Sequence, residues 1–236
     1  MSRAAATEIV RTLRQAEHQA YLVGGCVRDL VLGREPADYD VATDATPEQV
    51  MRIFPRSYAV GAQFGVVLVP VDGGSSTVEV ATFRSDIGYS DGRHPDQVRY
   101  TSSPQQDVQR RDFTINGLLY DPVENKVLDY VGGLADLRRG VVETIGEPDL
   151  RFREDKLRML RAVRFAARFT YAIEPATFAA IQRLAPLIHQ VSCERIREEL
   201  TKMLTEGHAR RAFELLDESG LLKEVLPEIS AMKGVQ

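Results

Sequence analysis

Apolar residues follow two different periods along the chain, and the change comes near residue 140. Before it, short β-prone apolar runs predict strands at residues 21–23, 64–71, 77–83, 118–121 and 127–130. After it, apolar residues recur mainly at helical spacing. The pattern predicts an α+β fold, in which a mixed sheet with flanking helices over residues 1–140 is followed by an all-α domain over residues 141–236.

Helix and loop signals complete the outline of the first domain. An amphipathic helix is predicted over residues 2–18. Another is predicted to begin at Thr46 as the N-cap, with Pro47 at its first position and Gln49 placed for a capping box. Residues 84–100 are rich in Gly, Asp, Ser and Arg, which predicts a long loop without regular structure.

Two glycines and two aspartates flank a short predicted helix near the N-terminus. Gly24 and Gly25 end the first predicted strand and allow the backbone to approach a ligand, because they have no Cβ; Arg28 lies in the helix that follows. Asp38 and Asp40 are predicted to share one face of the next strand, since strand side chains alternate. Two carboxylates so placed repel each other unless a divalent cation lies between them, and Mg²⁺ is the usual choice for oxygen ligands. The pair alone is also compatible with an exposed strand face.

Glu79 stands in the middle of a predicted apolar strand, between Val78 and Val80. An acid there costs free energy unless something pairs with it. It is either a residue on an edge-strand face or a third carboxylate beside Asp38 and Asp40.

A second amphipathic helix is predicted over residues 153–168 and carries a ridge of arginines. Arg158, Arg161 and Arg164 recur every three residues, and Asp155 lies one turn before Arg158. An arginine offers donors and a carboxylate offers acceptors, so Asp155 and Arg158 together could match the edges of cytosine and adenine. Uracil and guanine carry an oxygen where those two bases carry an amino group. The alternative is an ordinary amphipathic helix with a solvated basic side.

The formal net charge of −4 over 236 residues argues against a nucleic-acid partner, but the distribution of charge does not. Residues 138–168 contain nine Arg or Lys and five Asp or Glu, a local basic strip that can bind phosphates. The two cysteines, Cys26 and Cys193, lack metal-type spacing and predict a reducing, cytoplasmic location. No apolar run approaches the roughly 20 residues needed to span a membrane.

Several motifs together resemble one family. The segment from Leu22 to Thr43 is similar to the core of polymerase-β-like nucleotidyltransferases, and more closely to the class II tRNA nucleotidyltransferases (CCA-adding enzymes) and bacterial poly(A) polymerases. Residues 110–116 (RRDFTIN) and the pattern Glu154-Asp155-x-x-Arg158 match further motifs of this family. The resemblance covers nearly the whole chain and implies a polymerase-β-like head followed by a helical neck.

The resemblance also implies roles for the motif residues. Asp38 and Asp40 would hold the metal and catalyse, with Glu79 as the third catalytic carboxylate. The implied nucleotide-binding residues are Gly24, Gly25, Arg28, Arg111, Asp112, Asn116, Asp155, Arg158, Arg161 and Arg164.

Arg111 would contact phosphate, while Asp112 and Asn116 would hold the ribose. Asp155 and Arg158 would read the base. The alternative for the 110–116 motif is structural: Asp112 could cap the turn at Phe113, and the arginines could be surface charges.

The implied activity is template-independent addition of C and/or A from CTP and ATP to the 3′ end of tRNA, with Mg²⁺ in a two-metal site and release of pyrophosphate. No obligate protein partner is implied. Residues 84–100 would form the loop that helps such enzymes change from C to A, which argues against a CC-only enzyme, and residues 60–65 resemble the tRNA branch. Family members usually continue well beyond 236 residues, so a head-and-neck portion with weakened tRNA anchoring is expected.

Other activities fit part of the pattern. An A-adding or CC-adding specialist and a poly(A) polymerase differ from a full CCA-adding enzyme by features that one sequence does not settle. A small-molecule nucleotidyltransferase would share the glycines and aspartates but not Glu154-Asp155-x-x-Arg158 or the helical second half. A non-catalytic RNA-binding module would not need the intact metal and phosphate positions.

Overall fold

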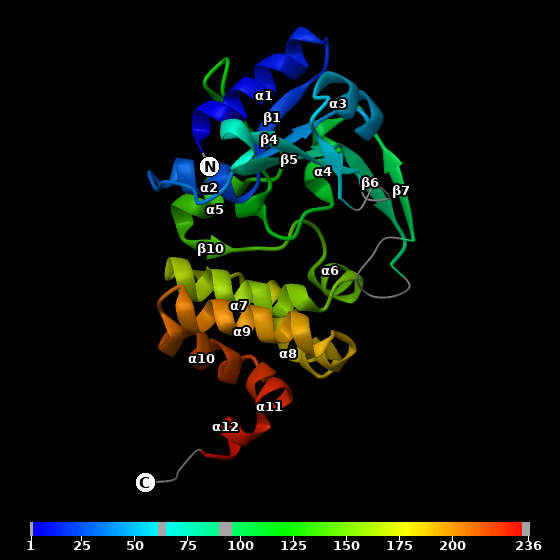
Figure 1. The fold of residues 1–236 in the computed structure, drawn as a ribbon. Helices are drawn as coiled ribbons and strands as arrows, with labels where there is room; N and C mark the ends of the chain where they lie inside the picture. Colours follow the sequence, from blue (N-terminus) through cyan, green and yellow to red (C-terminus); the bar gives the residue numbers. More distant parts are fainter. Residues whose placement is uncertain (1, 61–64, 90–95, 233–236) are drawn as a thin grey trace. The chain divides into compact units, whose positions relative to one another are not determined.

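The computed structural model describes residues 2–60, 65–89 and 96–232 (Figure 1). Its contacts divide the chain into two compact units, one of residues 1–87 and 97–137 and the other of residues 88–96 and 138–236. The functional division into a head over residues 1–140 and a neck over residues 141–236 stays a prediction. Among the described helices, none combines the length and hydropathy needed to cross a bilayer.

A seven-stranded sheet forms the centre of the first unit, in the order β3-β4-β5-β2-β1-β8-β9. Its strands are β1 (Ala20–Val23), β2 (Asp40–Thr43), β3 (Tyr58–Ala59), β4 (Val66–Val71), β5 (Ser76–Thr82), β8 (Leu118–Asp121) and β9 (Lys126–Asp129). Neighbouring strands pair antiparallel except β2 and β5, which are parallel. The mixed sheet is confirmed, and each predicted apolar run overlaps one of its strands.

Five helices accompany this sheet: α1 (Arg3–Gln15), α2 (Gly25–Val31), α3 (Pro47–Ile53), α4 (Pro104–Gln109) and α5 (Gly133–Arg139). The buried face of α1, which includes Ile9, Val10 and Leu13, packs on β1 and β2. The predicted capping box of α3 is present, since the Gln49 N–H donates to Thr46 Oγ1 at 3.4 Å and the Thr46 N–H donates to Gln49 Oε1 at 2.8 Å. Local capping chemistry therefore fixes this helix start, as the sequence predicts.

The prediction of an irregular loop at residues 84–100 is wrong where the structure describes it. Strands β6 (Arg84–Ile87) and β7 (Gln97–Tyr100) pair antiparallel as a separate ribbon. Arg84 and Asp86 lie two residues apart on β6 and form an ion pair at 3.0 Å. This ribbon thus carries charged side chains in a strand that lacks the apolar alternation by which strands are recognised. Residues 90–95, and residues 61–64 of the segment that resembles the tRNA branch, lie outside the described residues.

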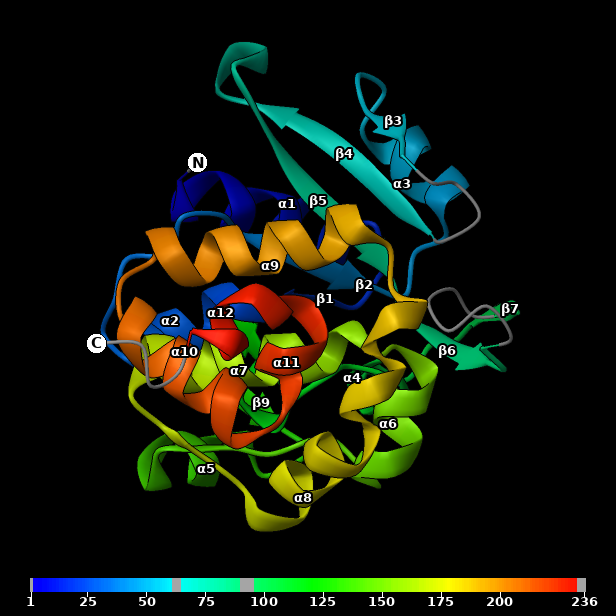
Figure 2. The same cartoon turned by 90° about the horizontal axis from the view of Figure 1, so that it is seen from below.

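The second unit is mainly helical. Its helices are α6 (Pro148–Glu154), α7 (Leu157–Phe169), α8 (Pro175–Leu184), α9 (Cys193–Thr205), α10 (Ala209–Glu218), α11 (Leu221–Val225) and α12 (Pro227–Ala231). The apolar side of α7 is buried, and this helix packs against α9 and α10 (Figure 1, Figure 2). A two-residue parallel ladder between β10 (Val141–Val142) and β11 (Ala172–Ile173) adds the one strand pair of this unit's described residues.

The prediction of one continuous helix over residues 153–168 is wrong. The chain breaks between α6 and α7 at Asp155, whose backbone is extended with φ −145° and ψ 106°. The Asp155 carboxylate accepts a hydrogen bond from the Leu157 N–H at 3.1 Å, so an acid that could continue a helix starts a new one instead. Asp155 therefore does not continue the helical face on which Arg158 lies.

Candidate active site

Gly24 and Gly25 form the turn that connects β1 to α2. Gly24 has φ +78°, a conformation that residues with a Cβ rarely adopt, and its N–H donates to the carbonyl of Leu118 in β8 at 3.2 Å. A Cβ added at Gly24 would lie 3.4 Å from Nη1 of Arg111. The turn thus keeps its backbone close to an arginine from a distant part of the sequence.

Arg28, Asp112 and Asn116 are joined by hydrogen bonds beside this turn. Arg28 is 4% exposed, and its Nη1 donates to Asn116 Oδ1 at 2.6 Å. Asn116 Nδ2 in turn donates to Asp112 Oδ1 at 3.1 Å. Asp112 also accepts from the Phe113 N–H at 2.8 Å, so it makes the local turn contact that the structural alternative expects. The structure brings the two motifs together, and their contact with a nucleotide stays a prediction.

Three acids gather near the same turn. Asp40 in β2 and Glu79 in β5 are direct partners in the parallel ladder, so their side chains project from one face of the sheet. Asp38 precedes β2 and is not part of the strand face predicted for it. Burial, followed by the negative charges of Glu79 and Asp38, raises the pKa of Asp40 to about 6, and the Arg111 guanidinium opposes this rise. The charges of Glu79, Asp38 and Arg111 therefore all act on Asp40.

The chemistry of these donors fits a divalent cation. Carboxylate oxygens are the ligands that Mg²⁺ prefers, and a cation would offset the burial and the carboxylate repulsion that raise the pKa of Asp40. Across the described residues, no three His, Cys, Asp or Glu side chains already form a metal-binding cluster. The role of Glu79 as a third carboxylate thus stays a prediction. The edge-strand alternative for Glu79 is wrong, because β5 lies between β4 and β2 and the side chain is exposed on the sheet face.

The two residues predicted to read a base each have a different partner in the second unit. Arg195 in α9 binds the Asp155 carboxylate with both terminal nitrogens, at 2.8 and 3.2 Å. Nη1 of Arg158 donates to Glu154 Oε2 at 2.7 Å and to the Arg151 carbonyl at 3.0 Å. A residue of α9 thus holds Asp155 in place, and two residues of α6 hold Arg158.

Arg161 and Arg164 face α9. Arg164 is 6% exposed, and its Nε donates to Glu199 Oε2 at 2.6 Å while its guanidinium lies 4.3 Å from the centre of the Phe165 ring. Arg161 is half-buried, with 3.9 Å between its Nη1 and Glu199 Oε1. The alternative of a solvated basic helix side is wrong for Arg158 and Arg164, which are both buried.

Comparison with known families agrees with this architecture. Residues 20–143, more than half of the chain, match the family described as the poly(A) polymerase head domain. The chain belongs to the family of CCA-adding enzymes and bacterial poly(A) polymerases. Residues 170–233 match a second family, described as the probable RNA- and SrmB-binding site of polymerase A.

Some relatives of this chain are named CCA-adding enzyme, and others are named poly(A) polymerase I. The chain is 42% identical over 228 residues to the CCA-adding enzyme of Bacillus licheniformis, covering 97% of this chain and 56% of the relative. It is also 42% identical over 238 residues to poly(A) polymerase I of Salmonella typhi, covering 95% of this chain and 50% of the relative. The chain therefore spans about half the length of these relatives, and identity alone does not separate the two names.

A solved structure shows the same fold. The crystal structure of the Bacillus stearothermophilus CCA-adding enzyme in complex with CTP matches with a TM-score of 0.84 and 42% identity, over 94% of this chain and 53% of that one. The polymerase-β-like head with a helical neck, expected from the motifs, is thereby confirmed for this family member.

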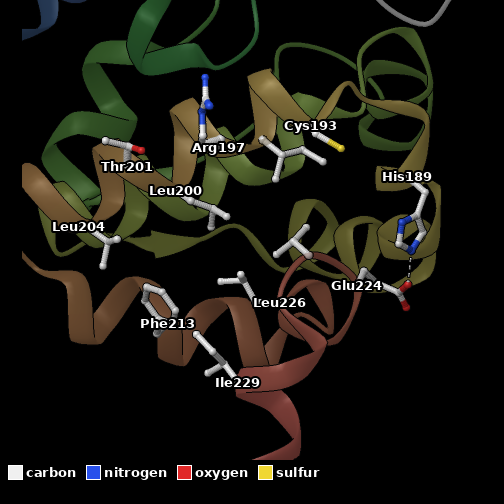
Figure 3. Close-up of a pocket in the computed structure, with 12 residues that line it drawn as sticks. His189, Cys193, Arg197, Leu200, Thr201, Leu204, Phe213, Glu224, Leu226 and Ile229 are labelled. Atoms are coloured by element: carbon white, nitrogen blue, oxygen red, sulfur yellow. Dashed lines mark hydrogen bonds and ion pairs between the residues drawn. The ribbon is translucent and has the colours of Figure 1, made fainter.

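A separate apolar pocket occurs among the last helices of the second unit (Figure 3). Its volume is about 640 Å³, and its lining includes Leu200, Leu204, Phe213, Leu226 and Ile229. None of the predicted site residues lines it. Because the predicted nucleotide-binding residues do not line this pocket, we do not assign it to the nucleotide.

Three carboxylates outside the predicted site residues bind arginines that were predicted. Asp107 binds Arg111, Glu154 binds Arg158, and Glu199 binds Arg164. Helical spacing offered a signal for two of them, since Asp107 and Glu154 each stand four residues before their arginine. Glu199 lies 35 positions from Arg164 and could be assigned only from the packing of α7 on α9.

Proposed function

We propose that this chain is the head and neck of a template-independent RNA nucleotidyltransferase that adds C and A from CTP and ATP to the 3′ end of tRNA. The observation that carries the proposal is the acidic group of Asp38, Asp40 and Glu79 beside the glycine turn and Arg111. Relatives named CCA-adding enzyme, one of them solved with CTP, support the substrate class. Because the chain spans about half of their length, the activity of the whole protein is part of the proposal. Work on tRNA would place the protein in the cytoplasm.

In the head, Asp38 and Asp40 would hold Mg²⁺ through their carboxylate oxygens. When bound, the metal supplies Lewis-acid chemistry that activates the RNA 3′-hydroxyl and stabilises the departing pyrophosphate. Because Gly24 has no Cβ, its backbone lies close to the Arg111 guanidinium. Arg111 would donate charge-assisted hydrogen bonds to the triphosphate. With its pKa raised to about 6, the Asp40 carboxyl would be partly protonated near neutral pH, and a bound cation would compete with that proton.

Further head residues would orient the nucleotide. Asp112 and Asn116 carry a carboxylate and an amide, which can bond the hydroxyls of a ribose. Arg28 fixes the orientation of the Asn116 amide through the hydrogen bond between Nη1 and Oδ1 at 2.6 Å. The buried network would thus present a prearranged set of acceptors and donors rather than mobile side chains.

In the neck, Asp155 and Arg158 would select the base by accepting from its amino group and donating to its ring acceptors. Arg195 and Glu154 hold these two side chains in fixed orientations, which selection by shape and hydrogen bonding requires. Arg161 would contact the triphosphate. The same role for Arg164 is less favoured, because its guanidinium is buried against Glu199 and Phe165.

The test is incubation of labelled tRNA that ends before CCA, at C or at CC with each of the four nucleoside triphosphates and Mg²⁺. A full CCA-adding enzyme gives two C additions followed by one A, whereas specialists extend only some of the three substrates. Incorporation of U or G at comparable rates would contradict the proposal.

Variants test the proposed roles of the head residues and of the neck residues separately. Asp38→Ala and Asp40→Ala should abolish transfer while CTP binding is largely retained, because the carboxylates serve the metal and not the nucleotide. Asp155→Ala combined with Arg158→Ala should relax the choice among nucleotides. Transfer at wild-type rates in the first pair, or unchanged selectivity in the double variant, would refute the assigned roles.

Poly(A) addition is the second candidate, and the 42% identity to poly(A) polymerase I favours it as much as the first relative favours CCA addition. An RNA without a tRNA fold discriminates between the two. A poly(A) polymerase extends such an RNA by many A residues, whereas a CCA-adding enzyme stops after completing CCA on tRNA.

A further inference from the structure

Asp107 is a buried carboxylate that lies behind the glycine turn. It is 1% exposed and belongs to α4, whose N-cap is Ser103. Its Oδ2 accepts from Arg111 Nη2 at 3.0 Å, and its Oδ1 accepts from Arg110 Nε at 2.9 Å. The backbone N–H of Arg84, the first residue of β6, donates to the same Oδ1 at 3.3 Å. One carboxylate therefore connects two consecutive arginines with the start of the β6–β7 ribbon.

The positive charges around Asp107 offset the unfavourable effect of burial on its ionised carboxylate. Burial opposes ionisation, but the Arg111 and Arg110 guanidinium groups hold the pKa of the Asp107 carboxyl below its ordinary value. Asp86 of β6 lies 4.0 Å from Arg110 and 3.0 Å from Arg84, which adds a second anion to the group. The two arginines thus favour the ionised form of Asp107.

The two ends of the Arg111 guanidinium have different surroundings. Nη2 is bonded to Asp107, whereas Nη1 is the atom nearest to a Cβ added at Gly24, at 3.4 Å. The charge of Arg111 also opposes the rise in the pKa of Asp40. One nitrogen is therefore anchored to the protein, and the other lies at the glycine turn on the side of the acidic group.

We propose that Asp107 is a positioning residue, which holds the Arg111 guanidinium against the glycine turn so that Arg111 meets the nucleotide triphosphate already oriented. This rests on the proposed function. A free arginine side chain loses rotamer entropy when it is fixed in one orientation. Asp107 imposes this entropy loss during folding, so the loss does not weaken nucleotide binding.

The role makes a selective prediction. Positioning of Arg111 affects the ligand through its phosphates and not through its base or ribose. Asp107→Asn should therefore weaken binding of CTP about tenfold or more, which corresponds to about 1.4 kcal/mol, and should change binding of CMP by less than about threefold. Both affinities can be measured by competition with a fluorescent nucleotide on the full 236-residue chain.

Asp121→Asn is the matched control. Asp121 is also buried in the first unit and also bonds an arginine, Arg14, at 2.6 Å, but Arg14 has no assigned role at the site. Any general loss of stability from removing a buried ion pair should appear in both variants. Only Asp107→Asn should weaken the binding of CTP more than the binding of CMP.

A double-mutant cycle tests whether Asp107 acts through Arg111. In an Arg111→Ala background, Asp107→Asn should have no further effect on the affinity for CTP. If Asp107→Asn does not fold, Asp107→Glu takes its place: it keeps the charge but moves it, and it should bind CTP more weakly than wild type with CMP binding unchanged.

Three outcomes overturn the inference. They are unchanged CTP affinity in the Asp107 variants, an equal loss for CTP and CMP, and an effect of Asp107→Asn that persists in full without Arg111. Failure of the wild-type chain to bind CTP is a separate result, because it would overturn the proposed function and with it this inference.

Discussion

Replacing Asp40 by asparagine should stabilise the protein at neutral pH when no divalent cation is present. Burial and the neighbouring carboxylates of Glu79 and Asp38 raise the pKa of Asp40 from 3.8 to about 6. At 1.36 kcal/mol for each pKa unit, this difference corresponds to about 3 kcal/mol. Asparagine is nearly the same size and carries no charge, so it removes both the cost of burying a charge and the repulsion without creating a cavity.

The sign follows from proton linkage. Because the pKa is higher in the folded protein, the favourable contribution of protonated Asp40 is complete below pH 3.8 and is lost as the pH rises through about 6. The free energy of unfolding of the variant minus that of the wild type should therefore be near zero at pH 4. It should rise by up to about 3 kcal/mol and level off above pH 7.

Urea denaturation in EDTA at pH 4 to 8 measures this difference, and groups that titrate equally in both proteins cancel. Added Mg²⁺ should reduce or reverse the difference, because a cation that binds only the folded wild type stabilises it by mass action. Parallel pH profiles of the two proteins would refute the electrostatic reasoning. If the difference in free energy of unfolding between the two proteins does not change when Mg²⁺ is added, the metal assignment is refuted.

Three further substitutions each test one contact: a buried ion pair, a close glycine contact and a helix cap. Glu199→Gln removes the buried carboxylate partner of Arg164 and should cost about 3–5 kcal/mol in urea denaturation; a cost below about 1 kcal/mol would show the pair to be dispensable. Gly133→Ala places a Cβ 2.2 Å from the Thr114 carbonyl oxygen and should cost about 1–3 kcal/mol and weaken CTP binding, whereas unchanged values for both would contradict the close packing. Thr46→Ala should cost about 1 kcal/mol through loss of the cap of α3, and an equal melting temperature would argue against that hydrogen bond.

Much of the fold was predictable because its signals are local. The strands of the central sheet follow apolar runs, and the start of α3 follows the hydrogen-bonding chemistry of Thr46 and Gln49. The clustering of the first motif with Arg111, Asp112 and Asn116 was implied by family resemblance and not by spacing. It depends on strand order, which places β8 beside β1.

Other features could not be predicted because they depend on interactions between polar groups. The β6–β7 ribbon has polar and charged side chains where a strand signal needs apolar ones. The break at Asp155 depends on its carboxylate bonding Leu157 and Arg195 rather than solvent. A helical period detects which residues face inward, but it does not show which charges will be paired there.

Because Arg158 and Arg164 of α7 are buried, their ion pairs should respond little to changes in ionic strength. Dissolved ions screen exposed charges over roughly 10 Å at 0.1 M salt, but they have little access to Arg158 and Arg164, which are 8% and 6% exposed. Concentrated salt should therefore leave the second unit folded while it weakens contacts made by exposed groups such as Arg153. A loss of polyanion binding on adding potassium chloride would then report on the surface of this unit and not on melting of its interior.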